Sequence, residues 1–267
     1  MPIVCKAKDR TAHGRDLRPE EAILKTDSCE VYRLIVAPGE RLSEHVGADD
    51  IIWFLVLSGR ASFGDDSIDG STVVVAGPDC QLTLVATETL ELLWVKVPRA
   101  SRFDAGIGPA NGICLVDWKR EPVLQSEHDA RTRIYMTTPA LSGTTAVKAE
   151  VITYPAGAAA PEHYHEGAEH FQYVISGSGT AVLNGDEQPL EAGDILYNFP
   201  NEWHYFVTDP AAEDAFVFVE LFVPGKCKTI WVEDANACAW LPTGKDVRGA
   251  VPVREIAYHV HGEDAGL

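Results

Sequence analysis

Short runs of apolar and β-branched residues, broken by glycine, proline and aspartate, recur along most of the chain. Runs of this length between turn residues are typical of β-strands, and many of them in succession favour a barrel or sandwich. We therefore expect little helix. The predicted strands cover residues 29–36, 51–57, 71–75, 82–97, 145–154, 171–175, 179–183, 194–198, 204–208 and 215–223.

This pattern occurs twice, at a constant offset of 118 residues. Three glycine and histidine positions recur at that offset, so that Gly39, His45 and Gly59 correspond to Gly157, His163 and Gly177. A chain of 267 residues is also long enough for two domains of ordinary size. The repeat predicts one domain over residues 1–125 and another over residues 126–267, with a connector within residues 107–141.

Four histidines of the second copy stand at spacings that can close on one metal ion. His163 and His165 are two residues apart, so on a strand both project from the same face. His170 begins the next predicted strand, and His204 begins a later one. Imidazole suits zinc, iron, copper and nickel, and several imidazoles around an open position are typical of a catalytic metal site. The sequence therefore predicts that these four histidines bind one metal ion.

These residues resemble the motifs of the cupin family, in which a glycine precedes a His-x-His pair and a later glycine and turn precede another histidine. The matching positions are Gly157, His163, His165, Gly177, Gly193 and His204. His170 stands where the family usually has glutamate, although some cupins carry four histidines. Asn201 stands where the turn usually has glycine, an exchange that a left-handed turn tolerates. The resemblance implies an all-β chain of two jelly-roll (cupin) barrels with a metal-dependent activity.

Glu169 is the main rival of His170 as the fourth metal ligand, because cupins allow either spacing. Period-two alternation favours His170, which shares its face of the strand with Gln172. Glu169 would then point away as a solvated carboxylate. A centre of neutral imidazoles alone would leave the ion its full double charge and favour a chelating anion such as a carboxylate or enolate.

The first copy keeps only one of these ligands. Gly47 and Ile52 stand where the second copy has His165 and His170, and Gln81 falls where His204 does if the flanking glycines are paired. His45 alone cannot hold a divalent ion. The first barrel is therefore expected to have a degenerate site.

Gln172 and Glu220 are the candidate catalytic residues outside the ligand set. Gln172 should point into the barrel and could hydrogen-bond substrate or bound water, or it could be a core amide satisfied by the backbone. Glu220 lies in an otherwise apolar strand, where burial would raise its pKa and suit it to proton transfer. A solvent-facing or salt-bridged structural role is the alternative for Glu220.

His259 and His261 near the C-terminus repeat the His-x-His spacing. No third ligand follows them in the sequence, so we expect a surface tail, unless the tail reaches a neighbouring subunit.

The formal net charge is −18, from 40 acidic and 22 basic residues, and no Lys/Arg run exceeds two. This composition argues against nucleic acid and anionic membrane surfaces as partners. The chain starts without the apolar core of a signal peptide, and its six cysteines form no C-x-x-C pair. We expect a cytoplasmic protein with a small anionic substrate, compatible with a homo-oligomer.

Two classes of enzyme fit the predicted site. A dioxygenase of a small aromatic or enolisable organic acid is favoured, with one divalent transition metal per chain. Fe²⁺ or Mn²⁺ suits this chemistry best, and Ni²⁺, Cu²⁺ or Zn²⁺ is compatible with the ligands. The alternative is a non-oxidative hydrolase, isomerase or lyase. The chain is similar to the ureidoglycine aminohydrolases in length and in having one degenerate barrel, but their ligand pattern differs. A third reading is a ligand-binding storage cupin without activity.

Overall fold

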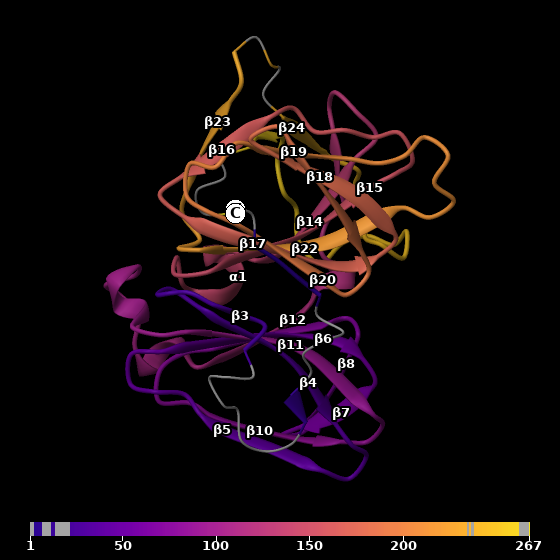
Figure 1. Cartoon of the computed structure of the whole chain (residues 1–267). Helices are drawn as coiled ribbons and strands as arrows, with labels where there is room; N and C mark the ends of the chain where they lie inside the picture. The colour runs from indigo at the N-terminus through magenta and orange to yellow at the C-terminus, as the bar shows by residue number, and fades with distance from the viewer. Residues whose placement is uncertain (1–2, 7–11, 14–21, 234, 236–237, 262–266) are drawn as a thin grey trace. The chain divides into compact units, whose positions relative to one another are not determined.

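The computed structural model describes residues 3–6, 12–13, 22–233, 235, 238–261 and 267 (Figure 1). Two compact units make up the chain. We call them the N-terminal barrel, which contains Ala7–Trp118 and Leu141–Ala146, and the C-terminal barrel, which contains Lys119–Ala140 and Val147–Leu267. The first strand of the chain also belongs to the C-terminal barrel. The division is therefore not the single boundary after residue 125 that the sequence suggests.

Two antiparallel sheets form the C-terminal barrel. The nine-stranded sheet runs, in spatial order, through β1 (Ile3–Lys6), β20 (Asp194–Asn198), β17 (Glu169–Ser176), β22 (Phe216–Val223), β15 (Lys148–Tyr154), β14 (Thr132–Thr137), β13 (Leu124–Ser126), β24 (Ala239–Pro242) and β25 (His259–Val260). The five-stranded sheet runs through β19 (Asp186–Glu191), β18 (Ser178–Leu183), β21 (His204–Val207), β16 (His163–Glu166) and β23 (Lys228–Trp231).

The N-terminal barrel also has two sheets. The larger sheet runs through β12 (Ile113–Asp117), β9 (Thr72–Ala76), β6 (Ile51–Ser58), β11 (Leu90–Val97), β4 (Glu30–Val36) and β2 (Ala12–His13), with β3 (Leu24–Lys25) also paired to β4. The smaller sheet runs through β5 (Arg41–His45), β10 (Gln81–Ala86), β7 (Arg60–Phe63) and β8 (Asp66–Asp69). The all-β prediction is confirmed, although the expected connector itself contributes β12, β13 and β14.

Helix is confined to short segments in the described part of the chain. They are the single-turn α1 (Pro139–Ser142) and the 3₁₀ turns Ala100–Arg102, Pro109–Asn111 and Trp118–Arg120. None of the described helices is long and apolar enough to span a membrane.

The repeated glycines adopt the same strained conformation in both barrels. Gly59 and Gly177 have φ angles of 81° and 72°. A Cβ on either glycine would lie 2.0 Å from the carbonyl oxygen of Thr89 or 2.2 Å from that of Ala215. Only glycine fits such a close approach at positive φ. The turn residue Asn201 has φ 64°, the left-handed conformation expected for it.

The interiors of the two barrels differ at one pair of neighbouring strands. In the N-terminal barrel, β6 and β11 place Phe54 opposite Trp94, and the two rings stack with centroids 5.0 Å apart. In the C-terminal barrel, β17 and β22 place Gln172 opposite Glu220. The position that is filled by apolar rings in one barrel is thus polar in the other.

Candidate metal centre

Strands β16 and β21 bring three of the predicted histidines together. His163 and His165 are both buried on one face of β16, while Tyr164 between them is only partly buried, as the alternation predicted. The β16–β21 pairing sets His163 directly opposite His204. The ring of His204 lies 4.4 Å from that of His163 and 5.3 Å from that of His165, measured between centroids.

Strand β17 carries both His170 and Glu169, the two adjacent candidates for the fourth metal ligand. His170 is 2% exposed and its ring lies 4.8 Å from the rings of His165 and His204. The Glu169 carboxylate lies elsewhere and accepts a hydrogen bond of 2.5 Å from the Tyr197 hydroxyl. Period-two alternation therefore places His170, and not Glu169, at the cluster.

The ligand atoms of His165, His170, His204 and Glu220 all lie within 4.8 Å of one another. His170 Nε2 is 3.3 Å from His204 Nε2 and 3.5 Å from Glu220 Oε1. All four side chains are buried. We call this group the His3Glu cluster. Glu220 joins it because the β17–β22 register holds it opposite Gln172, two residues from His170 on the same face.

His163 lies beside the His3Glu cluster rather than in it. Its Nδ1 donates to the Pro161 carbonyl at 2.8 Å, and its ring packs 4.8 Å from the Trp231 ring. The sequence predicted four histidine ligands. The group that comes together in the structure contains three histidines and one carboxylate instead. A carboxylate ligand would lower the net charge of a divalent centre, so the argument from a fully charged ion does not carry over to this geometry.

The donor set of the His3Glu cluster fits a divalent transition metal. The Nδ1 atom of His204 donates to the Glu202 carbonyl at 2.8 Å, which leaves the Nε2 lone pair facing the cluster. Thr229 Oγ1 and His165 Nδ1 share a hydrogen bond of 3.1 Å, while His165 Nε2 is buried with no hydrogen-bond partner among the described residues. Metal-ligating histidines are held in this way, with the outer nitrogen bound to the protein and the inner one available.

Burial keeps these imidazoles neutral, as metal binding requires. It is the largest cause that lowers the pKa of His165 and His170 well below the usual value, with neighbouring histidines adding to the effect. Burial likewise lowers the pKa of His163 and takes that of His204 to about 4. At neutral pH each imidazole therefore keeps one unprotonated ring nitrogen.

The pKa of Glu220 is shifted in the opposite direction, upward. Burial, and next the nearby Glu150 carboxylate, raise its pKa to about 8, although Gln172 Nε2 donates a hydrogen bond of 2.6 Å to Oε1. In the metal-free protein the close contact of Glu220 with His170 therefore joins two neutral groups, because both pKa shifts disfavour an ion pair. The predicted pair Gln172 and Glu220 is thus brought together at the cluster, in direct contact.

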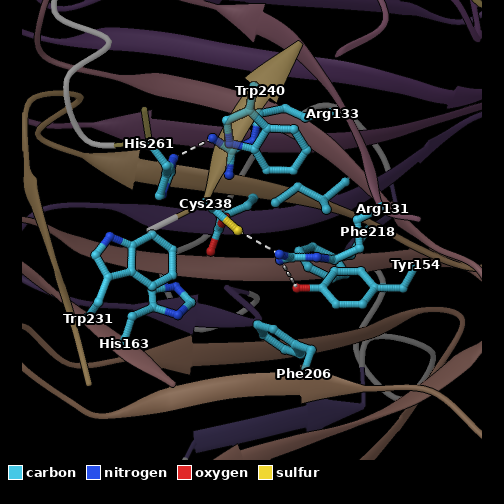
Figure 2. Close-up of a pocket in the computed structure, with 12 residues that line it drawn as sticks. Arg131, Arg133, Tyr154, His163, Phe206, Phe218, Trp231, Cys238, Trp240 and His261 are labelled. Carbon is cyan, nitrogen blue, oxygen red and sulfur yellow. Dashed lines mark hydrogen bonds between the residues drawn. The ribbon is translucent and has the colours of Figure 1, made fainter. Parts of the chain in front are cut away.

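A cavity of about 20 Å³ lies beside the cluster (Figure 2). Its lining combines histidine, arginine and large aromatic side chains with Glu220: Arg131, Arg133, Ile152, Tyr154, His163, Phe206, Phe218, Glu220, Trp231, Cys238, Trp240 and His261. A volume of this size holds about one water molecule and is far below the range of preformed small-molecule sites. A larger ligand would therefore have to displace side chains of the lining.

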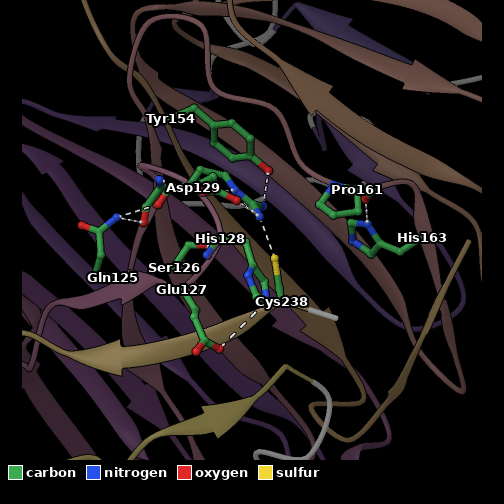
Figure 3. A network of polar contacts seen from close by, with 10 residues as sticks. Gln125, Ser126, Glu127, His128, Asp129, Tyr154, Pro161, His163 and Cys238 are labelled. Carbon is green, nitrogen blue, oxygen red and sulfur yellow. Dashed lines mark hydrogen bonds and ion pairs between the residues drawn. The ribbon is translucent and has the colours of Figure 1, made fainter. Parts of the chain in front are cut away.

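The cavity includes two arginines that the sequence reasoning missed. Arg131 and Arg133 are both 3% exposed. Arg131 directly precedes β14 and Arg133 lies in it, and their alternating positions in the sequence were the only signal. Arg131 is held by Asp129 at 2.7 and 2.9 Å, by the Tyr154 hydroxyl at 3.2 Å and by Cys238 Sγ at 2.6 Å. These three partners are labelled in Figure 3.

His261 corrects the expectation of a surface tail. The side chain is 5% exposed, and its ring lies 5.8 Å from the His165 ring and 6.5 Å from the His163 ring. The physical cause is strand pairing: β25 adds to β24, and the His261 N–H donates to the Cys238 carbonyl at 2.8 Å. Its ring nitrogen contacts the Arg133 guanidinium (Figure 2).

The N-terminal barrel has no such cluster among its described residues. His45 is exposed at the end of β5, and the β5–β10 pairing sets Gln81 opposite it. This matches the register of His163 and His204 and confirms that Gln81 stands in the place of the missing histidine.

Residues 150–220 match the family model of the cupin domain. No curated protein sequence gives a match. Among solved structures, two single-site variants of the oxalate decarboxylase of Bacillus subtilis match with TM-scores of 0.60, at 15% and 14% identity. The match covers 77% of this chain and 71% of theirs. Another structure of that enzyme, whose Mn(II) centres were studied, matches with a TM-score of 0.57 at 15% identity. The C-terminal half of the chain therefore contains a cupin domain, and the chain as a whole has the two-barrel, all-β fold of the bicupin oxalate decarboxylase, at an identity that shows the fold alone.

Proposed function

We propose that this chain is a metal-dependent enzyme that acts on a small organic acid in the C-terminal barrel. The observation that carries the proposal is the His3Glu cluster, a buried group of ligand atoms within 4.8 Å of one another that borders a small cavity through Glu220. A structural role alone gives no reason to bury three imidazoles with a carboxylate, because unpaired polar groups in an apolar interior cost stability.

One divalent transition metal per chain would be held by His165, His170, His204 and Glu220. Mixed imidazole and carboxylate ligands suit Fe²⁺ and Mn²⁺, and the structurally similar oxalate decarboxylase has Mn(II) centres. A bound ion of this kind supplies a Lewis acid and, if redox-active, a site for dioxygen chemistry.

The residues around the cluster have separable tasks in the proposed reaction. Glu220 would bind the metal as a carboxylate or, where the three histidines alone hold the ion, keep its proton at neutral pH beside the reacting atoms, and in either case Gln172 orients it through the 2.6 Å hydrogen bond. Phe206, Phe218 and Trp231 make one part of the cavity apolar and limit the access of water. The small cavity favours an enolisable aliphatic acid over an aromatic one.

The favoured reaction is dioxygenase cleavage of such an acid. The aromatic side chains that line part of the cavity support it, because reactive oxygen chemistry needs water and side reactions to be excluded. A non-oxidative reaction, such as that of a lyase, isomerase or hydrolase, is the second candidate. The specific observation in its favour is the raised pKa of Glu220 in the metal-free protein, which provides a general acid without any redox step where the three histidines alone hold the ion.

Loading the apoprotein separately with Fe²⁺, Mn²⁺, Ni²⁺ and Zn²⁺ tests the proposal. Each form would be incubated with catechols, hydroxylated aromatic acids, β-dicarbonyls, small dicarboxylates and ureido acids. Dissolved oxygen, carbon dioxide and ammonia would be followed together. The dioxygenase predicts oxygen uptake that depends on substrate and is absent with Zn²⁺, which has no redox chemistry. Turnover under anaerobic conditions, or equal turnover with Zn²⁺, would reject it in favour of the non-oxidative reaction.

A further inference from the structure

Two neighbouring arginines face the same cavity, but their donors are used differently. Every nitrogen of the Arg131 guanidinium has a partner within the protein, namely Asp129, Tyr154 or Cys238. Arg133 Nε has no hydrogen-bond partner among the described residues. Its Nη2 lies 3.3 Å from Glu150, and its Nη1 lies 3.4 Å from the Tyr135 hydroxyl and also contacts His261.

The spare donor of Arg133 is held in one orientation. The guanidinium carbon lies 4.2 Å from the centre of the Trp240 ring, so the cation is stacked on the indole face. The Arg133 side chain is 4% exposed, and burial of a guanidinium with an unused N–H costs free energy that a ligand oxygen would recover. A fixed guanidinium with one unused N–H is suited to bind one oxygen of a carboxylate through a charge-assisted hydrogen bond.

The same cavity connects this donor to the His3Glu cluster. Arg133 and Glu220 both line it, and His163 beside the cluster lines it as well. The Glu150 carboxylate stays next to Arg133 and balances its charge in the free protein, so an anionic ligand would meet a cation that is already oriented. Arg131 does not compete for that ligand, because Asp129 takes two of its donors.

We infer that Arg133, stacked on Trp240 and contacted by His261, forms a carboxylate-binding subsite that fixes one end of the substrate while its other end reaches the His3Glu cluster. The substrate is then a small organic acid with a second oxygen function, such as a dicarboxylate or an oxo acid. The part of this inference that concerns the cluster rests on the proposed function. The carboxylate subsite itself stands on the geometry of Arg133.

Nuclear magnetic resonance of the zinc-loaded, ¹⁵N-arginine-labelled protein tests the subsite without any substitution. Zinc is diamagnetic, so the Arg133 Nε–H signal can be assigned and followed during titration with malonate. Malonamide, which has the same size and no charge, is the matched probe. A saturable shift of the Arg133 signal with malonate, and none with malonamide, is the expected result. No shift of that signal at saturating malonate would overturn the inference.

Calorimetric titration of variants provides an independent measurement. Lysine keeps the charge but lacks the planar fork, so Arg133→Lys should weaken malonate binding about 10–100-fold, the scale of one or two charge-assisted hydrogen bonds, and leave malonamide unaffected. Arg131→Lys, two residues away in the same cavity lining, is the matched control, and it should keep the wild-type preference for malonate over malonamide. An equal preference in Arg133→Lys and wild type would contradict the inference.

Failure of the subsite and failure of the proposed function give different results. A protein that takes up no zinc, yet shows the Arg133 shift with malonate, would retain the carboxylate subsite and lose the metal-dependent function. If the protein binds zinc but the Arg133 signal does not shift with malonate, the metal centre is supported and the carboxylate subsite is refuted.

Discussion

Five buried histidines should make the metal-free protein sensitive to mild acid. His163, His165, His170 and His261 have pKa values well below the usual value, and that of His204 is about 4. In the unfolded chain each would titrate near its ordinary value of about 6.5. Between these two pKa values the unfolded state binds more protons than the native state. The free energy of unfolding therefore falls as the pH falls below about 6.5.

The magnitude follows from linkage. Lowering the pH from 7.5 to 5.5 costs each such histidine about 1.4 kcal/mol of stability, so five of them cost about 7 kcal/mol. Glu220 acts in the opposite direction, because its native pKa of about 8 lies above its unfolded value. Its contribution is present at low pH and is lost as the pH rises through 8, and over this interval it returns about 2–3 kcal/mol. The net loss is about 4–5 kcal/mol, a large share of the stability of an ordinary domain.

Urea unfolding of the chelator-treated protein at pH 7.5, 6.5 and 5.5 measures this loss. His261→Phe should reduce it by about 1.4 kcal/mol, because one buried proton site is removed. His45→Ala is the control, since that histidine is exposed, and it should leave the pH dependence unchanged. A difference below about 1 kcal/mol between pH 7.5 and 5.5 in the wild type would refute the reasoning, since it would mean that the native histidines accept protons.

Three further predictions concern the His3Glu cluster. Metal analysis should find close to one divalent ion per chain, lost in His204→Ala and kept in His45→Ala; an ion retained in His204→Ala would show that the cluster is misassigned. His170→Ala should lower metal affinity by at least about tenfold and Glu169→Ala should change it little, measured by competition with a chelator, and the reverse order would place Glu169 in the centre. Glu220→Gln should preserve the circular dichroism spectrum but lower turnover by about 10²–10⁴-fold, whereas near-wild-type turnover would return Glu220 to a structural role.

Local pattern was sufficient to predict the strands and part of the site. The burial of His163 and His165 on one face, and the separation of His170 from Glu169, follow from period-two alternation alone. The left-handed turn at Asn201 follows from its residue type. These features depend on residues that are neighbours in sequence, so they can be predicted from the sequence.

The rest depends on contacts between distant segments. Glu220 meets His170 because β17 and β22 are paired in one particular register, and a strand sequence does not reveal its partner. His261 is buried because a two-residue strand joins the edge of the sheet beside β24. Arg133 was overlooked because arginine in a strand is usually exposed, whereas here Glu150 and Trp240 accompany it into the interior.

The polar interior of the C-terminal barrel costs folding stability, which a bound ligand would offset. The stacked Phe54 and Trp94 stabilise the N-terminal barrel by apolar burial and ring packing, which need no ligand. At the corresponding strand pair the C-terminal barrel buries Gln172 and Glu220, and Gln172 Oε1 has no hydrogen-bond partner among the described residues. A ligand that binds only the native state adds stability in proportion to the logarithm of its concentration, about 2.7 kcal/mol at a hundredfold excess over Kd. The C-terminal barrel is therefore the one whose stability should depend on metal. Its polar interior is consistent with a site retained for binding, because the N-terminal barrel has the same strand arrangement at this position with an apolar interior.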